Sequence, residues 1–352
     1  MTPVELSRAV LCAVRRAVDD GELSVAVPDR AVVTPPGPGG RGDYATGIAL
    51  QLARPAGQTP LRVAEVLRPY LMGAEGVRGV EITGPGFLNL SLDGPAVADL
   101  VRRIRAEGPR YGHGDGLAGE VFEVRVPYEV RAEVLADVLA RMVGAQGGRV
   151  DVSHDGGHGG HGGERGRAVL RPAPAPEDPA PLGLDAARWA LIHPGPHDRP
   201  RITADHLVQR EGNPLFRVRY AHARTRAVCR NAADLGFAAE PGPLDAADLV
   251  GLLADHPRVL GTAVAVAVAP SNRPVKPSSG ARVVPDVGAP SRLARHLVGV
   301  ADATLVLLPA VLPRGAEKPS AAHRARLALA EAAGAVLAGG LSLLGIDAPD
   351  HL

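Results

Sequence analysis

The middle of the chain holds a single strand–helix–strand pattern, which limits the available folds more than any other feature. Residues 121–126 predict a buried strand, residues 129–144 a helix, and the sequence GGRVDV a second strand. One such βαβ unit takes about 30 residues. A doubly wound nucleotide-binding sheet needs two βαβαβ halves, whereas this pattern stops after one unit. The middle of the chain therefore has room for a remnant of such a sheet and not for a complete one.

A low-complexity segment follows the βαβ unit. Residues 154–183 are first rich in Gly and His and then in Pro and Ala, the composition of a linker. His154, His158 and His161 are of a residue type that binds Zn²⁺ or Ni²⁺. No cysteine pair or carboxylate cluster supports a designed site, so the sequence favours incidental histidines. We expect no metal site and no cofactor.

Residues 1–112 predict a compact α+β domain. Apolar spacing and turn residues give its elements in order: helices over residues 3–18 and 43–54, a helix starting in QTPLRVAEVLRPYL, strands over 78–83 and 87–92, and a helix over 96–106. Asp43 is the expected N-cap of the second helix, and Thr59 with Pro60 opens the third. Gly47 then lies inside a helix, where glycine costs about 1 kcal/mol relative to alanine.

Residues 184–352 predict an all-α bundle of about five helices. These helices cover LDAARWALI, residues 213–235, LDAADLVGLLADH, PSRLARHLVGVADATLVLL and AHRARLALAEAAGAVLAGGLSLLG. The stretch GTAVAVAVAP between them is too short to span a membrane and predicts a strand or a buried helix.

Charge, cysteine content and hydropathy limit the compartment and the partners. The net charge of +1 predicts no general attraction to nucleic acid, so any such binding depends on local patches. Cys12 and Cys229 each lie in a predicted helix, and we expect two reduced core thiols rather than one disulfide. No run reaches about 18 apolar residues, which predicts no membrane span. We expect a cytoplasmic protein that binds neither membranes nor DNA.

One local patch stands out, in NPLFRVRYAHARTRAVCR. This stretch, residues 213–230, carries five arginines and no acidic residue. On a helix Arg219, Arg226 and Arg230 share one face, and Arg217 and Arg224 share another. Two interpretations remain open: a solvated basic face, or a helix that contacts a polyanion through its phosphates.

Several stretches resemble one known family, the arginyl-tRNA synthetases. GDYATGIALQLAR and ITGPGFLNLSL resemble its N-terminal additional domain. NPLFRVRYAHARTRAV and RLALAEAAGAVLAGGLSLLGIDAPDHL resemble its C-terminal anticodon-binding bundle, the DALR domain, and GLDAARWALI and PSRLARHL fit the segments between. The resemblance implies an α+β N-terminal domain over 1–112, a vestigial βαβ (a Rossmann remnant) over 113–153, a linker over 154–183 and an all-α DALR-like helical bundle over 184–352.

The class I active-site motifs of this family are missing. The resemblance places the HIGH signature at EVFEVRVPYEV, where there is no histidine. HGGH, residues 158–161, lies after the βαβ unit in a glycine run. VKPSS, residues 275–279, follows the arginine-rich helix, whereas the KMSKS loop of the family precedes it. The cationic and histidine groups of these motifs stabilise the phosphorus transition state, so the resemblance implies that adenylate formation is lost.

The resemblance also implies which residues contact RNA. Tyr220 matches an aromatic that the family places against the anticodon loop, where unstacked bases are recognised by aromatic stacking. Phe87 and Asn89 match a strand position that the family uses at the outer corner of the tRNA. The predicted RNA-binding residues are Arg217, Arg219, Tyr220, Arg224, Arg226, Arg230, Phe87 and Asn89, and no catalytic residue is predicted.

Each of these residues also has a structural alternative. Tyr220 and Phe87 can be core aromatics, Asn89 a strand-turn residue, and His222 a residue packed inside the bundle. The sequence also departs from the family pattern: Arg217 replaces a second aromatic, Arg219 replaces a glutamine, and Leu352 replaces a terminal methionine. The stacking capacity expected for anticodon recognition is thereby reduced.

The sequence therefore predicts a non-catalytic relative of arginyl-tRNA synthetase that binds tRNA, arginine tRNA first, through its two end domains. Two alternatives remain open. The chain can be a protein-interaction or regulatory module that has lost RNA binding. It can also be an arginine–tRNA ligase that uses ATP at an unrecognised site, although its length argues against this.

Overall fold

The computed structural model describes residues 3–352 apart from 35, 37–41, 93, 155–166 and 268–281. These residues form two compact units. The first unit consists of Met1–Ala106, Ala232–Asp255 and Pro309–Ala330, and the second of Glu107–Asn231, His256–Leu308 and Glu331–Leu352.

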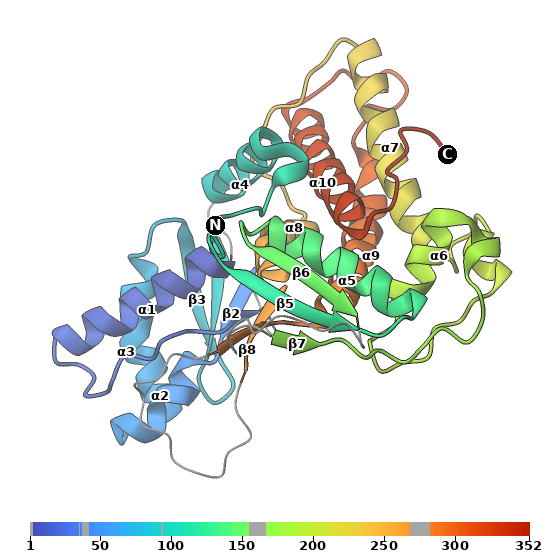
Figure 1. Ribbon diagram of the computed structural model, residues 1–352. Helices are drawn as coiled ribbons and strands as arrows, with labels where there is room; N and C mark the ends of the chain where they lie inside the picture. The colour runs from blue at the N-terminus through green and yellow to red at the C-terminus, as the bar shows by residue number, and fades with distance from the viewer. Residues whose placement is uncertain (1–2, 35, 37–41, 93, 155–166, 268–281) are drawn as a thin grey trace. The chain divides into compact units, whose positions relative to one another are not determined.

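The first unit is built on a four-stranded antiparallel sheet (Figure 1). Its strands are β1 (Val33–Thr34), β2 (Tyr44–Thr46), β3 (Val77–Thr83) and β4 (Phe87–Leu92), in the order β1-β2-β4-β3. Its helices are α1 (Pro3–Asp19), α2 (Ile48–Ala56), α3 (Pro60–Met72) and α4 (Gly94–Glu107). The helix α3 contacts α1, α2 and β3, and the buried side chains of Leu67 and Leu88 belong to this core. The α+β prediction for this part is confirmed.

The helix predicted over residues 43–54 begins later than expected. Residues 44–46 form β2, which pairs with the central strand β4. Asp43 is not a helix cap, because its carboxylate accepts a hydrogen bond from the backbone N–H of Leu92 at 2.7 Å. Sheet pairing outweighs the local helical pattern here, so the prediction for the start of α2 was wrong.

Two predictions about helix starts have different outcomes. Gly47 stands at the N-cap of α2 and outside the helix interior, so the penalty expected for a glycine in mid-helix does not arise. Thr59 caps α3 as predicted, because its hydroxyl accepts the backbone N–H of Arg62 at 3.3 Å.

The second unit contains the expected βαβ unit. β5 (Val121–Val126) leads through α5 (Val130–Gly144) to β6 (Arg149–His154), and the two strands are parallel. Phe122, Val124 and Val126 are buried along β5, in the alternation typical of a strand with one covered face. A third parallel strand, β7 (Arg167–Val169), pairs on the other side of β5, which gives the order β6-β5-β7.

The linker predicted over residues 154–183 is ordered in its second part. Residues 155–166 lie outside the described residues, but residues 167–169 form β7. After β7, Leu170 is buried, and the N–H of Ala175 donates to the carboxylate of Glu129 at 2.9 Å. Composition predicted a linker here, whereas strand pairing and backbone hydrogen bonds fix the proline-rich part onto the βαβ unit.

Five α-helices follow, as predicted: α6 (Gly183–Ile192), α7 (Pro214–Asp234), α8 (Ala247–Gly261), α9 (Ala289–Leu307) and α10 (Ala321–Leu344). The end of α7 and the beginnings of α8 and α10 belong to the first unit. The region is not all-α, because β8 (Val264–Ala267) and β9 (Arg282–Pro285) form an antiparallel pair. GTAVAVAVAP therefore contains a strand, one of the two structures predicted for it.

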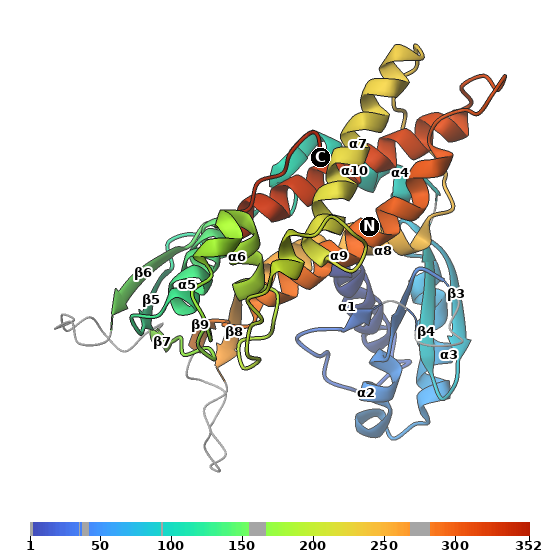
Figure 2. The ribbon, with the colours of Figure 1, turned by 90° about the vertical axis from the view of Figure 1, so that its right-hand side faces the viewer.

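α7 and α10 lie side by side (Figure 2). Their contact is close because Gly334 of α10 has no side chain. A Cβ at this position would lie 2.6 Å from Oγ1 of Thr225 on α7, closer than real Cβ atoms approach. The Thr225 hydroxyl donates back to the carbonyl of His222 at 2.7 Å, which removes a polar hydrogen from this contact.

α9 and α10 are also long and apolar enough to cross a membrane, by length and composition alone. Most of α10 is buried inside the fold. A buried core helix meets the same criterion, and packing accounts for the apolar composition of α10 without a bilayer.

Arg131 ties the βαβ unit to the segment before α7. This arginine of α5 is completely buried. Its guanidinium donates to five backbone carbonyl oxygens, those of Ala173, Leu191, Pro194, Gly195 and Asp198, at 2.7 to 3.3 Å. A buried charge is tolerated only when its hydrogen-bonding capacity is satisfied, and these carbonyls satisfy it.

Candidate nucleic-acid interface

The arginine-rich helix α7 begins at a well-formed cap. Oδ1 of Asn213 accepts the backbone N–H of Leu215 at 3.1 Å and that of Phe216 at 3.4 Å. Its Nδ2 donates to the carbonyls of His206 and Val208. Asn213 thus caps α7 and also fixes the preceding segment against the start of this helix.

Four of the five arginines of α7 have a partner within the second unit. Arg217 lies 3.4 Å from the carboxylate of Asp302 on α9, and Arg219 lies 3.4 Å from that of Asp185 on α6. Arg224 is exposed and has no ion-pair partner among the described residues. The positive charge that the sequence places on this helix is therefore largely compensated.

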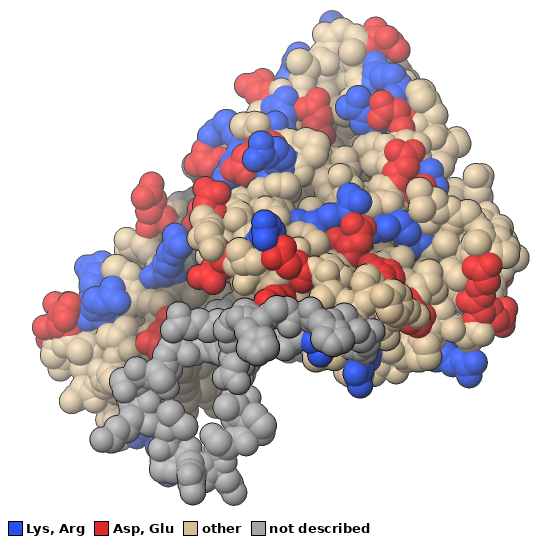
Figure 3. Space-filling model, viewed as in Figure 1, with Lys and Arg blue, Asp and Glu red and all other residues tan. Residues whose placement is uncertain are grey.

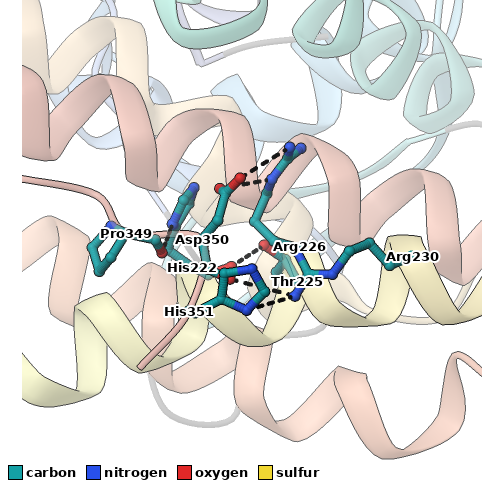
Figure 4. Close-up of polar contacts among 7 residues, drawn as sticks. All are labelled: His222, Thr225, Arg226, Arg230, Pro349, Asp350 and His351. Carbon is teal, nitrogen blue, oxygen red and sulfur yellow. Dashed lines mark hydrogen bonds and ion pairs between the residues drawn. The ribbon is translucent and has the colours of Figure 1, made fainter.

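The chain's last residues partner the other two arginines (Figure 4). Arg226 holds the carboxylate of Asp350 at 3.0 Å, and Arg230 donates to the backbone carbonyl of Asp350 at 3.4 Å. The ring of His351 also contacts Arg230 at 3.3 Å. The hydrogen bond from Arg226 lowers the pKa of Asp350 below its ordinary value. We call residues 346–352, which follow α10, the C-terminal tail.

His222 fixes the C-terminal tail from inside the bundle. The side chain is buried, and Nδ1 lies 3.0 Å from the carbonyl of Pro349. Burial lowers the pKa of His222, and the hydrogen bond to this carbonyl opposes that effect. The structural alternative for His222 is confirmed.

An aromatic pair lies at the start of α7, beside a pocket. The rings of Phe216 and Tyr220 are stacked with centroids 5.4 Å apart, and Tyr220 is 37% exposed. The pocket has a volume of about 490 Å³, and its lining includes Leu184, Asp185, Leu207, Phe216, Arg219, Asp347 and Leu352. Exposed aromatic and aliphatic surface beside a guanidinium is suited to an unstacked base.

The two residues predicted in the first unit differ in accessibility. Phe87, at the start of β4, is 42% exposed, whereas Asn89 is 2% exposed. The amide of Asn89 donates to the hydroxyl of Thr83 at 2.7 Å. Phe87 therefore presents a ring to solvent. Asn89 of β4 is instead hydrogen-bonded to Thr83 at the end of β3, beside the turn of the hairpin.

The junction of β5 and α5 is where the family resemblance places an ATP-binding histidine. It holds Pro127, Tyr128 and Glu129. Glu129 caps α5, because its carboxylate accepts the N–H of Ala132 at 2.9 Å. The ring of Tyr128 is stacked on that of His154 at the end of β6, with centroids 4.4 Å apart.

Of the three histidines considered as metal ligands, His154 is the one that lies in the described residues. His154 contacts the carboxylate of Glu133. His158 and His161, and with them HGGH, fall in residues 155–166, and VKPSS falls in 268–281, both outside the described residues. Among described residues no group of three His, Cys, Asp or Glu side chains is placed to hold a metal.

The two cysteines differ in their surroundings. Neither Cys12 nor Cys229 forms a disulfide, and Cys12 is exposed on α1. The prediction of a core thiol was wrong for Cys12, because it lies on the solvent face of an amphipathic helix.

Sequence reasoning missed Arg131 and the basic side chains before α7, Arg199 and Arg201. The spacing of Arg131 could have identified it. This residue lies four positions before Leu135 and seven before Val138, and therefore on the apolar face of α5. An arginine on that face predicts a buried, hydrogen-bonded charge.

On the face of the molecule shown in Figure 3, acidic and basic side chains are interspersed. This distribution agrees with the net charge of +1. Among the residues drawn in colour, this face thus offers a polyanion no broad basic surface.

Two known domain families match the chain. The arginyl tRNA synthetase N terminal domain matches residues 5–92, and the DALR anticodon binding domain matches residues 218–352. The second match includes most of α7, all of α10 and the C-terminal tail.

Curated relatives over part of the chain are arginine–tRNA ligases. The enzyme of Frankia alni is 38% identical over 195 residues, 51% of this chain and 35% of that protein. That of Kineococcus radiotolerans is 36% identical over 236 residues, 61% of this chain and 43% of that protein. The chain thus spans less than half the length of these relatives.

A solved structure supports the fold. The Thermus thermophilus arginyl-tRNA synthetase superposes with a TM-score of 0.67 over the whole of both chains, at 14% sequence identity. At this identity the match shows a similar fold and no more. The chain carries an arginyl-tRNA synthetase N-terminal domain and a DALR anticodon-binding domain, and is homologous to the arginine–tRNA ligases over part of their length.

Proposed function

We propose that this chain is a non-catalytic relative of arginyl-tRNA synthetase that binds tRNA, with arginine tRNA as the first candidate. The observation that carries the proposal is the start of α7, where the stacked Phe216 and Tyr220 lie beside a pocket lined by Arg219. This helix lies in the part of the chain that matches an anticodon-binding domain. Arg224 adds an exposed charge with no ion-pair partner among the described residues.

The absence of catalysis is part of the proposal. Three parallel strands and one helix make up the βαβ region of the described residues, fewer than a doubly wound nucleotide-binding sheet requires. Glu129 and Tyr128 occupy the junction where the family resemblance places the ATP-binding histidine. A pyrophosphate-exchange assay with arginine and ATP tests this, and measurable exchange would refute the proposal.

One observation favours the alternative of a protein-interaction module. The arginines of α7 at positions 217, 219, 226 and 230 already have acidic or tail partners. An RNA must displace these contacts or use the remaining groups. A protein partner would need no such exchange.

A salt titration of binding to a total tRNA pool separates the two functions. Phosphate contacts make the logarithm of the binding constant fall linearly with the logarithm of the salt concentration. Binding of tRNA therefore predicts a steep slope and, for retained specificity, enriched arginine tRNAs. Tyr220→Ala tests stacking, and we expect a loss of about 1–3 kcal/mol per stacked base. Asp115→Ala is the control, because Asp115 is exposed outside α7. No binding at low salt would instead support the interaction module.

A further inference from the structure

A second pocket lies beside the end of α6, apart from the aromatic pair of α7. It has a volume of about 490 Å³. The end of α6, the segment before α7 and one residue of α9 form its walls. Its basic lining residues are His193, Arg199, Arg201, His206 and Arg295. We call it the Arg295 pocket.

Among the described residues, the two acidic residues that line the Arg295 pocket form no ion pair with its arginines. The carboxylate of Asp198 accepts the N–H of Gly195 at 3.1 Å, and that of Asp205 pairs with Arg210 at 3.2 Å. Within the described residues, Arg199, Arg201 and Arg295 have no carboxylate at ion-pair distance. Arg295 donates to the hydroxyl of Ser291, a neutral partner, at 3.1 Å.

The wall of the pocket is fixed by the buried Arg131. Its guanidinium holds the carbonyl oxygens of Pro194, Gly195 and Asp198. Because these oxygens accept hydrogen bonds from the guanidinium, they do not present unpaired acceptors to an anion in the pocket. The wall is also ordered before a ligand arrives, which lowers the entropic cost of binding.

His193 reports the positive field inside the pocket. Burial lowers its pKa first, and the charges of Arg295, His206 and Arg217 lower it further. Two of these three neighbours, Arg295 and His206, also line the pocket.

We propose that the Arg295 pocket binds a phosphate group, held by Arg199, Arg201 and Arg295. Arginine presents a planar fork of donors that matches the oxygens of phosphate. The phosphate comes from an RNA backbone or from a free phosphate compound. The proposal stands apart from tRNA binding through α7, because it uses none of the side chains of that helix.

Trp189 makes the pocket observable. It is the chain's one tryptophan, and its buried ring is stacked on His193 with centroids 5.2 Å apart. An anion at Arg295 changes the charge beside this imidazole and hence the environment of the indole. We expect a saturable change in Trp189 fluorescence when inorganic pyrophosphate is titrated at low salt, and a weaker response as salt rises.

Variants test whether the arginines are responsible. One variant combines Arg199→Ala with Arg201→Ala, and a second carries Arg295→Ala alone. In each we expect pyrophosphate binding to weaken by about tenfold or more. Arg62→Ala is the matched control, because Arg62 is exposed in the first unit, where it pairs with Glu65 at 3.4 Å. Circular dichroism verifies that each variant is folded.

The phosphate source follows from competition. If excess pyrophosphate displaces tRNA and the pocket variants bind tRNA less tightly, the phosphate belongs to RNA. If tRNA is unaffected or does not bind at all, while pyrophosphate does, a free phosphate compound is the ligand. No saturable fluorescence change and no heat in calorimetry would overturn the proposal. Binding that persists unchanged in the arginine variants would also overturn it.

Discussion

At the scale of single residues, the structure separates two kinds of arginine. Arg131 is completely buried and hydrogen-bonded to five carbonyls. Arg224 is exposed on α7 and lacks an ion-pair partner in the described part of the chain. The first kind stabilises the fold, and the second is available to a ligand.

Arg131→Met is expected to destabilise the protein strongly. The substitution removes the donor of five backbone carbonyl oxygens, and each acceptor left buried and unsatisfied costs about 1–3 kcal/mol. Urea unfolding followed by circular dichroism measures the change. Arg141→Ala on the same helix is the control; its pair with Asp137 is exposed, so we expect a change of about 0.5 kcal/mol or less. Equal effects of the two variants would contradict the role assigned to Arg131.

Asp350→Asn is expected to strengthen binding of tRNA. The change removes the carboxylate that holds Arg226 and weakens the C-terminal tail over Arg230. Each arginine freed for a phosphate steepens the slope of log K against log salt by roughly 0.7–0.9. Binding titrations at several salt concentrations measure this, with Asp115→Asn as an equal charge change elsewhere. An unchanged slope would show that the tail does not limit access to these arginines.

The Arg226–Asp350 contact is not a switch near neutral pH. The pKa of Asp350 is depressed in the folded protein. Its contribution is therefore present above the unfolded carboxyl pKa and is lost as pH falls through the still lower folded pKa. Asp350 therefore keeps its negative charge throughout the physiological range.

At the scale of elements, α8 and α9 meet through histidines. His256 of α8 is fully buried, and its ring is stacked on His296 of α9 with centroids 5.3 Å apart. Burial lowers the pKa of His256 well below its ordinary value, and His296 adds to this effect. The folded protein therefore keeps His256 neutral.

The second unit is expected to lose stability in mild acid. The unfolded chain binds a proton on His256 below about pH 6.5, whereas the folded chain does not. Stability is thus complete above that pH and decreases as pH falls towards the folded pKa. Thermal unfolding between pH 7.5 and 5 measures the slope, and His256→Gln is expected to reduce it. An unchanged slope would assign the effect to His113, His193 and His222, whose pKa values are also lowered.

Much of the element pattern follows from the sequence, because periodicity and capping act over a few residues. The starts of α3 and α7 follow from Thr59 and Asn213 for this reason. β2, β7 and β9 do not follow, because each is held by pairing with a strand distant in sequence. The sequence was enough to name the arginines and the tyrosine of the candidate site. It did not predict that the C-terminal tail would pair with Arg226 and Arg230, because that contact joins residues more than a hundred positions apart.

At the scale of the whole molecule, the βαβ region belongs to the same compact unit as most of the C-terminal helices. Arg188 of α6 joins Asp137 of α5 to the carbonyl of Leu344 at the end of α10. Composition suggested a boundary at residue 184, which these contacts cross.

A fragment of residues 184–352 is therefore expected not to fold stably. It lacks α5, and with it the partners of Arg188 and of the carbonyls that Arg131 holds. Circular dichroism and hydrogen exchange measure its order, with a fragment of residues 107–352 as the matched comparison. A cooperatively unfolding 184–352 fragment would show that the C-terminal helices are independent.

The hydrogen bonds of Arg131 also limit how a lineage can shorten such a chain. A deletion extending into α5 would leave five carbonyl oxygens in the neighbouring segment without their donor. A shortened chain that keeps the segment before α7 ordered must therefore keep α5 as well.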